Sequence, residues 1–398
     1  MADPILKTYL SQVVRHFELA AVHLAARQAV VGAGAPAVPA GGAAGPGARR
    51  GTGSGPGGRV PVPGNVPPWP GVEDLDFHGT LAAIWIWARH QLLTGERRFA
   101  RARELGWTFV DWAWAGFIPE ALGPAASDEA AFDCAMVLRA ATVELALPAG
   151  PGRPVVEARA GATARVLATY LGGLEAPSGR EFQDPGFLAW SLIDYGRAVA
   201  DRGLLAAGRG FVERAFGMKA PPSFASEAES SGGLFDFSST TATRVLATLA
   251  SEGNTPFVGA WLRERVAPAI HPGFLPRNLD ENCWNACVAV FLGRAYVIST
   301  DPRFLDAYRA ICGELGRRDF DVDGAIACDG RDETRVADTL GTFYYALATD
   351  ALLRQDGGAG QATGAGAGGR AGGAPGEPAG PPTLSAHEHG HGHGHGRR

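Results

Sequence analysis

The sequence predicts an all-α protein built from helical hairpins, and two recurring patterns support that prediction. Aspartates that could open helices recur at intervals of 44 to 56 residues: Asp76, Asp128, Asp184, Asp236, Asp280 and Asp332. Each interval can hold two helices of ordinary length and two connections. The turn T-G-E-R-R-F at 94–99 also has a counterpart, S-T-D-P-R-F, at 299–304. The alternative is an irregular helical bundle in which the spacing of the aspartates is accidental.

The two ends of the chain differ from its centre. Apolar residues at helical spacing between Ile5 and Val30 predict a helix within residues 1–31. Residues 32–70 are rich in Gly, Ala and Pro, which predicts a flexible linker, and the Gly-rich residues 357–398 predict a disordered tail. Residues 71–356 are therefore the expected globular domain, joined by the first helix.

The hairpins follow one another through that domain. In the first, Phe77–Leu93 is apolar nearly all round and is expected to be buried on both sides, whereas Arg97–Trp114 has one charged face. Four more hairpins are expected to begin at Asp128, Asp184, Asp236 and Asp280. The helix predicted at 333–354, after Asp332, has no partner, because the tail follows it.

Counting these elements predicts a closed arrangement. Five hairpins with a single helix at each end make six pairs if the first helix packs against the last, and closure buries both open ends. The pattern resembles the (α/α)6 toroids, which include the six-hairpin glycosidases, related sugar epimerases, polysaccharide lyases and terpenoid-cyclase-like proteins. The resemblance spans residues 76–354 and the first helix. The D-x-D-D motif of triterpene cyclases and the zinc ligands of lanthionine cyclases are absent.

Composition narrows the classes of function. The chain has 398 residues and a net charge of -5, so it lacks the basic character of a nucleic-acid-binding protein. Its five cysteines form no C-x-x-C pair, which favours free thiols in a reducing compartment. Neither a leader peptide nor an apolar run of the ~18 residues that span a bilayer is recognisable. We therefore expect a cytoplasmic protein without a membrane partner.

Candidate catalytic residues lie where the predicted inner helices begin. The connections that lead into these helices are long, and the resemblance implies a cleft on this same face. Acidic pairs open three of the helices, and glycoside hydrolysis needs two carboxyl groups. His78 could carry a proton beside them. The expected catalytic residues are Asp280, Glu281, Asp128, Glu129, Asp332 and His78. The alternative is that these acids only cap helices and complement the helix dipole.

Aromatic residues near the same ends could stack on sugar rings. The expected substrate-binding residues are Trp284, Trp190, Phe182 and Phe235, together with Asp184 and Asp76. The expected substrate is a small sugar or an oligosaccharide.

No cofactor is required by this chemistry, but two segments could hold metal ions. Alternating histidines in the tail could converge on Ni²⁺, Zn²⁺ or Cu²⁺: His387, His389, His391, His393 and His395. The loop D-F-D-V-D-G places Asp319, Asp321 and Asp323 as in the start of a calcium loop, although position 12 is Gly330 instead of Glu.

Three functions remain open from the sequence. The first is a carbohydrate-active enzyme, either a glycoside hydrolase or a related sugar-processing toroid, that uses acid/base carboxylates. The second is a non-catalytic helical scaffold that binds a peptide or protein. The third is a metal-handling protein that uses the histidine-rich tail. The oligomeric state is open in all three.

Overall fold

The computed structural model describes residues 4–28, 62–68, 75–122, 128–174, 185–215, 239–252, 256–270, 282–327 and 337–353. Within these ranges every regular element is a helix, so the prediction of an all-α protein is confirmed. Contacts between residues divide the chain into two units, Met1–Asp356 and Gly357–Arg398, and all the described residues belong to the first.

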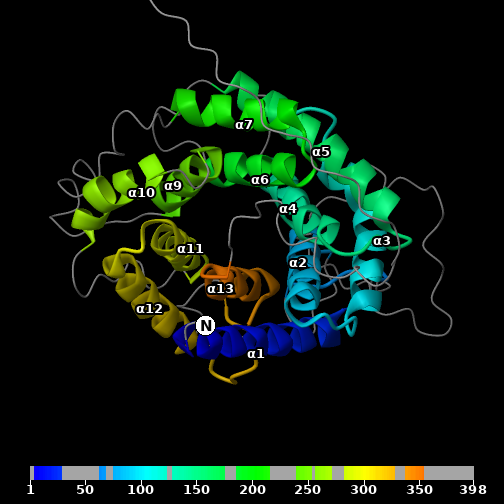
Figure 1. Ribbon diagram of the computed structural model, residues 1–398. Helices are drawn as coiled ribbons and strands as arrows, with labels where there is room; N and C mark the ends of the chain where they lie inside the picture. Colours follow the sequence, from blue (N-terminus) through cyan, green and yellow to red (C-terminus); the bar gives the residue numbers. More distant parts are fainter. Residues whose placement is uncertain are drawn as a thin grey trace, which may run out of the picture. The chain divides into compact units, whose positions relative to one another are not determined.

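Six of the described helices form an inner series in which each one packs against the next (Figure 1). The contacts run from α2 through α4, α6, α9, α11 and α13, and α13 packs back against α2, so they make a closed circuit. Inner helices are buried on nearly every side, as predicted for the first of them, and in α2 the side chains of Trp85, Ile86 and Trp87 are fully buried. The bounds are α2 Phe77–Thr94, α4 Asp128–Leu145, α6 Pro185–Ala198, α9 Ser239–Glu252, α11 Asn282–Ser299 and α13 Thr339–Asp350.

The remaining helices lie outside the inner series in Figure 1. Four of them pack against the inner helix that precedes them: α3 on α2, α5 on α4, α7 on α6 and α12 on α11. The first helix, α1, packs against both α2 and α13, so the predicted contact between the first and last helices is present. The bounds are α1 Pro4–Arg27, α3 Ala100–Phe117, α5 Arg153–Gly173, α7 Arg202–Ala215, α10 Pro256–Trp261 with a π-helical turn to Val266, and α12 Pro302–Gly316.

Left-handed residues end three of the inner helices. Gly95, Ala200 and Thr300 have φ angles of 76°, 55° and 58°, and each stands between an inner helix and the outer helix that follows. A left-handed residue closes a helix because its backbone N–H can bond the carbonyl of the last turn. Gly95 N donates to Gln91 O at 2.8 Å and Thr300 N donates to Tyr296 O at 2.8 Å. The two turns that recur in the sequence therefore share a left-handed residue that ends the inner helix.

Glycines on outer helices allow two hairpins to pack closely. A Cβ at Gly106 of α3 would lie 2.9 Å from Ile84 Cγ1 of α2, and one at Gly208 of α7 would lie 2.6 Å from Ile193 Cγ1 of α6. Both distances are below van der Waals contact, so a side chain at either position would push the helices apart.

One predicted helix start was wrong. The sequence placed the opening of the last inner helix after Asp332, but α13 begins at Thr339 with Asp338 as its N-cap, whose side chain accepts a hydrogen bond from Gly341 N. Thr339 Oγ1 also donates to Pro67 O at 2.9 Å. The helix starts where these bonds satisfy its first N–H and hydroxyl groups, and an acidic pair alone does not mark that place. Asp332 itself lies outside the described residues.

Part of the predicted flexible linker is packed against the helices. Val66 is fully buried and its N–H donates to Thr80 Oγ1 at 2.9 Å. Gly64 has a φ angle of 86°, and a Cβ there would lie 2.0 Å from Leu105 O, so only glycine fits. Residues 62–68 therefore form an ordered strap between α1 and α2, and the rest of 32–70 lies outside the described residues.

Candidate functional site

The N-terminal end of α2 is held by its capping aspartate. Asp76 Oδ1 accepts a hydrogen bond from Gly79 N at 2.8 Å, and Asp76 N donates to Asn65 Oδ1 at 2.9 Å. A Cβ at Gly79 would lie 2.1 Å from Asp76 Oδ2, so glycine is needed for this close approach. The backbone N–H and the carboxylate of Asp76 are therefore both held by hydrogen bonds, and the side chain is 7% exposed.

His78 lies between Asp76 and a second carboxylate. Its Nε2 is 3.5 Å from Asp76 Oδ1, and its Nδ1 is 3.4 Å from Asp133 Oδ1 on α4. The imidazole is 36% exposed, whereas Asp133 is 1% exposed. We call Asp76, His78 and Asp133 the carboxylate–histidine cluster. It presents one accessible titratable group backed by two buried acids.

Burial governs the electrostatics of the cluster. It raises the pKa of the Asp76 carboxyl, because water no longer solvates the anion, and the nearby charge of Asp133 raises it further. His78 and the hydrogen bond from Gly79 N lower the pKa of Asp76 and offset part of that rise. Two acids that share one imidazole in this way can hold a proton on the ring or pass one through it.

Neighbouring aromatic rings bound the cluster on the α4 side. The Phe132 ring meets His78 edge to face at 5.9 Å between ring centroids and stacks on Phe187 of α6 at 5.6 Å. These contacts place an apolar wall beside the exposed imidazole.

Of the predicted site residues, the structure brings Asp76 and His78 together, and it adds Asp133, which the sequence reasoning missed. The signal was an aspartate inside the apolar run of α4, in the stretch A-A-F-D-C-A-M-V. The helices that carry Asp128, Glu129 and Trp284 are described, but those side chains are not. The other candidates lie outside the described residues: Phe182, Asp184, Phe235, Asp280, Glu281, Asp332 and the five tail histidines.

Trp190 lies in the core and not on an open face. It is 1% exposed, and the Arg139 guanidinium lies 3.4 Å from the centroid of its ring. Arg139 also donates to Ser191 Oγ at 2.9 Å and to Asp194 Oδ2 at 2.8 Å. A sugar ring could not stack on the face that Arg139 covers, so the prediction of Trp190 as a substrate platform is corrected to a structural role.

The predicted calcium loop uses its carboxylates within the protein. Asp319 accepts hydrogen bonds from the N–H groups of Asp323 and Gly324, each at 3.0 Å. Asp323 Oδ2 pairs with His23 Nδ1 of α1 at 2.7 Å. Calcium binding through Asp319, Asp321 and Asp323 stays a prediction.

A second histidine and two glutamates meet at the opposite end of α2. Glu18, His90 and Glu96 place their ligand atoms within 4.8 Å of one another. Glu18 already contacts both His90, at 2.6 Å, and Arg98. These contacts make the group an ion-pair network, and we assign it no metal.

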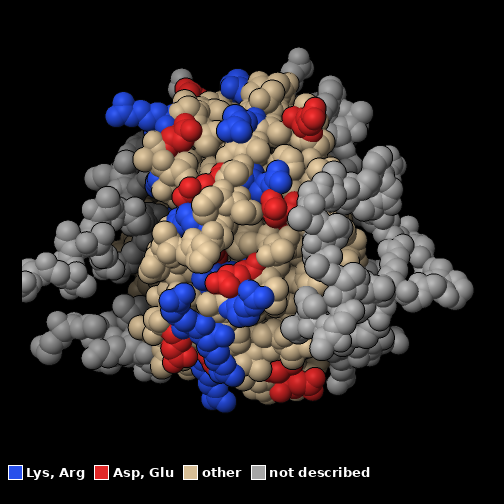
Figure 2. Space-filling model, turned by 90° about the vertical axis from the view of Figure 1, so that its right-hand side faces the viewer, with Lys and Arg blue, Asp and Glu red and all other residues tan. Residues whose placement is uncertain are grey.

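Ion pairs also cover the face that carries α3 and α5. Figure 2 shows acidic and basic side chains interspersed there. Arg103 of α3 pairs with Glu144 at 2.8 Å and Arg159 of α5 pairs with Asp111 at 2.6 Å. On this face Arg103 and Arg159 are therefore each paired with a carboxylate.

Comparisons with known protein families, with curated proteins and with solved structures gave no match. Among the described helices, none combines the length and apolar character needed to cross a membrane.

Proposed function

We propose that the chain is a sugar-processing enzyme built on an (α/α)6 toroid, with the carboxylate–histidine cluster as its acid–base centre. The closed circuit of inner-helix contacts, with outer helices packed on it, supports the toroid. In the toroids that the sequence resembles, the cleft lies at the N-terminal ends of the inner helices. Asp76 and His78 open α2, and Asp133 lies in the second turn of α4, so the cluster occupies the corresponding end.

The position of His78 carries the proposal. An imidazole that is 36% exposed can reach a substrate, and the two buried carboxylates behind it lie within 3.5 Å of its ring nitrogens. Such a group can protonate a leaving oxygen or abstract a proton from a hydroxyl-bearing carbon. Proton transfer by a positioned side chain contributes about 10² to 10⁴ in rate.

The acidic residues that the sequence predicts at neighbouring helix starts would supply the second carboxyl group. Glycoside hydrolysis places its two carboxyl groups about 5 to 10 Å apart. Asp128 and Glu129 begin α4, the helix that also carries Asp133, and they are the nearest candidates along the chain.

A sugar panel tests the proposal. Thermal shift of the full chain against mono- and oligosaccharides, with EDTA present to silence the tail histidines, should show a rise in melting temperature with at least one sugar. NMR of the anomeric protons should then show that this sugar is converted.

Two variants separate catalysis from binding. We expect His78→Gln to abolish conversion of that sugar while its melting-temperature shift persists, because glutamine keeps polar contacts but cannot carry the proton. His23→Gln, on α1 and paired with Asp323, is the matched control and should leave conversion unchanged. A protein that melts cooperatively and responds to no sugar would refute the proposal and favour a binding scaffold.

A further inference from the structure

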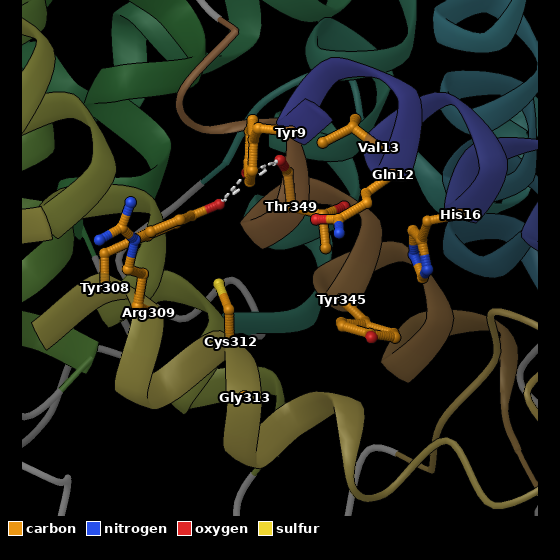
Figure 3. Close-up of a pocket in the computed structure, with 10 residues that line it drawn as sticks. All are labelled: Tyr9, Gln12, Val13, His16, Tyr308, Arg309, Cys312, Gly313, Tyr345 and Thr349. Carbon is orange, nitrogen blue, oxygen red and sulfur yellow. Dashed lines mark hydrogen bonds between the residues drawn. The ribbon is translucent and has the colours of Figure 1, made fainter. Parts of the chain in front are cut away.

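A cavity lies at the seam where α1 meets α12 and α13. It has a volume of about 620 Å³ and lies between α1, α12 and α13 (Figure 3). A cavity of this size matches the pockets that hold small organic ligands. It shares no residue with the carboxylate–histidine cluster.

The walls of this seam pocket are fixed by tyrosines. The hydroxyl groups of Tyr9 on α1 and Tyr308 on α12 contact each other, and Tyr9 also donates to Thr349 O on α13. Tyr308 donates to Ala348 O at 3.0 Å. One group of hydrogen bonds thus ties all three helices together, so the cavity is formed before any ligand enters.

Two polar groups of the lining lack partners. His16 Nε2 is buried, and in the part of the chain that the structure describes it has no hydrogen-bond partner. Arg309 is exposed at the pocket, and within those same residues it makes neither an ion pair nor a hydrogen bond. The His16 nitrogen is closed to water, so the polar group of the lining that a ligand can reach is the Arg309 guanidinium.

The lining carries one formal charge at neutral pH. Burial lowers the pKa of His16 to about 4 and raises that of the Cys312 thiol to about 12, so both are neutral. Burial also raises the pKa of the Tyr9, Tyr308 and Tyr345 hydroxyls. Among the described residues that line the cavity none is acidic, so the Arg309 guanidinium is the one charged group among them.

We propose that the seam pocket binds a small aromatic carboxylate. Figure 3 shows Arg309 and His16 on opposite sides of the pocket, with Gln12 and Tyr345 between them. The carboxylate pairs with Arg309, whose planar fork suits two carboxylate oxygens. The ring lies among the tyrosine side chains, where edge-to-face contacts are favourable.

Fluorine NMR of the full chain tests this binding, with 4-fluorobenzoate as the probe and neutral 4-fluorobenzamide for comparison. We expect the benzoate signal to broaden and shift on titration with protein. Arg309→Gln should weaken benzoate binding about tenfold or more, because a charge-assisted pair is lost, and should leave the amide unchanged. Arg209→Gln, an exposed arginine on α7, is the matched control.

A blocking variant tests the location. Gly313 lines the pocket, and a Cβ there meets no atom within 4 Å, so Gly313→Leu places a bulky side chain in the cavity and favours the helix. We expect it to abolish binding while unfolding remains cooperative. Wild-type protein that does not bind 4-fluorobenzoate, or binding that survives either Arg309→Gln or Gly313→Leu, would overturn the proposal.

Discussion

Asp76 has two effects on stability that two substitutions can separate. Its Oδ1 caps α2 through the bond from Gly79 N, and its buried charge carries a desolvation cost that raises its pKa. Asparagine caps a helix about as well as aspartate, but it carries no charge. Alanine removes both effects. We therefore expect Asp76→Ala to unfold with a free energy about 1 kcal/mol lower than Asp76→Asn, the usual value of an N-cap.

The dependence on pH has a defined sign. A carboxyl whose pKa is raised in the folded state binds more protons there than in the unfolded chain, so it lowers stability as pH rises above its ordinary value of 3.8. The stability of Asp76→Asn relative to the wild type should therefore increase from pH 4 upward. Catalytic conversion should be lost in both variants, because the cluster is broken.

Urea unfolding followed by circular dichroism at pH 5 and pH 8 measures these differences. Asp338 provides the matched control, because it caps α13 through Gly341 N in the same way. If Asp76→Asn were as unstable as Asp76→Ala, the side-chain oxygen at this position would not stabilise the helix start. If Asp76→Asn grew less stable than the wild type with rising pH, the charge of Asp76 would be stabilising. Either result would contradict the prediction.

Three further predictions concern packing and titration. Gly208→Ala should lower the free energy of unfolding by about 1 to 2 kcal/mol, because the added Cβ meets Ile193 of α6. Gly210→Ala, whose Cβ meets only a flexible arginine, should raise the free energy of unfolding by about 0.5 to 1 kcal/mol. Equal effects of the two substitutions in urea unfolding would contradict the close packing of α7 on α6. Arg139→Met should cost about 3 kcal/mol because Asp194 loses its close ion pair and keeps only Arg197 at 3.9 Å, and adding Asp194→Leu should restore most of the loss in a double-mutant cycle. His16 has a folded pKa of about 4, so stability should fall by about 3 kcal/mol as pH drops from 6.5 to 4, and His16→Gln should flatten that slope in thermal melts.

Local chemistry made the start of α2 predictable. An aspartate that opens an apolar stretch satisfies the first N–H groups of a helix, and Asp76 does so as the sequence indicated. The same rule failed at Asp332, because the true cap, Asp338, is selected by contacts between Thr339 and residues 67 and 68, some 270 positions earlier. Sequence patterns do not contain such contacts.

The candidate site was predictable only in part, for a related reason. Asp76 and His78 are close in sequence, so they could be placed on one face. Asp133 joins them from another helix, and an acid within an apolar run gave no sign of what it faces. Trp190 is an aromatic residue of the type that stacks on sugar rings, but Arg139 covers its ring from a neighbouring helix. Whether an aromatic ring is open depends on what packs across it.

The seam between α1 and the last hairpin has a consequence for synthesis in the cell. Tyr9 contacts Tyr308 and Thr349, which follow it by 299 and 340 residues. The ribosome releases the N-terminal helix long before these partners exist, so its buried residues, Val13, Phe17 and Leu24 among them, lack their final cover while most of the chain is being made. Exposed apolar surface of this kind recruits chaperones and promotes aggregation. Expression of this protein should therefore respond to chaperone supply.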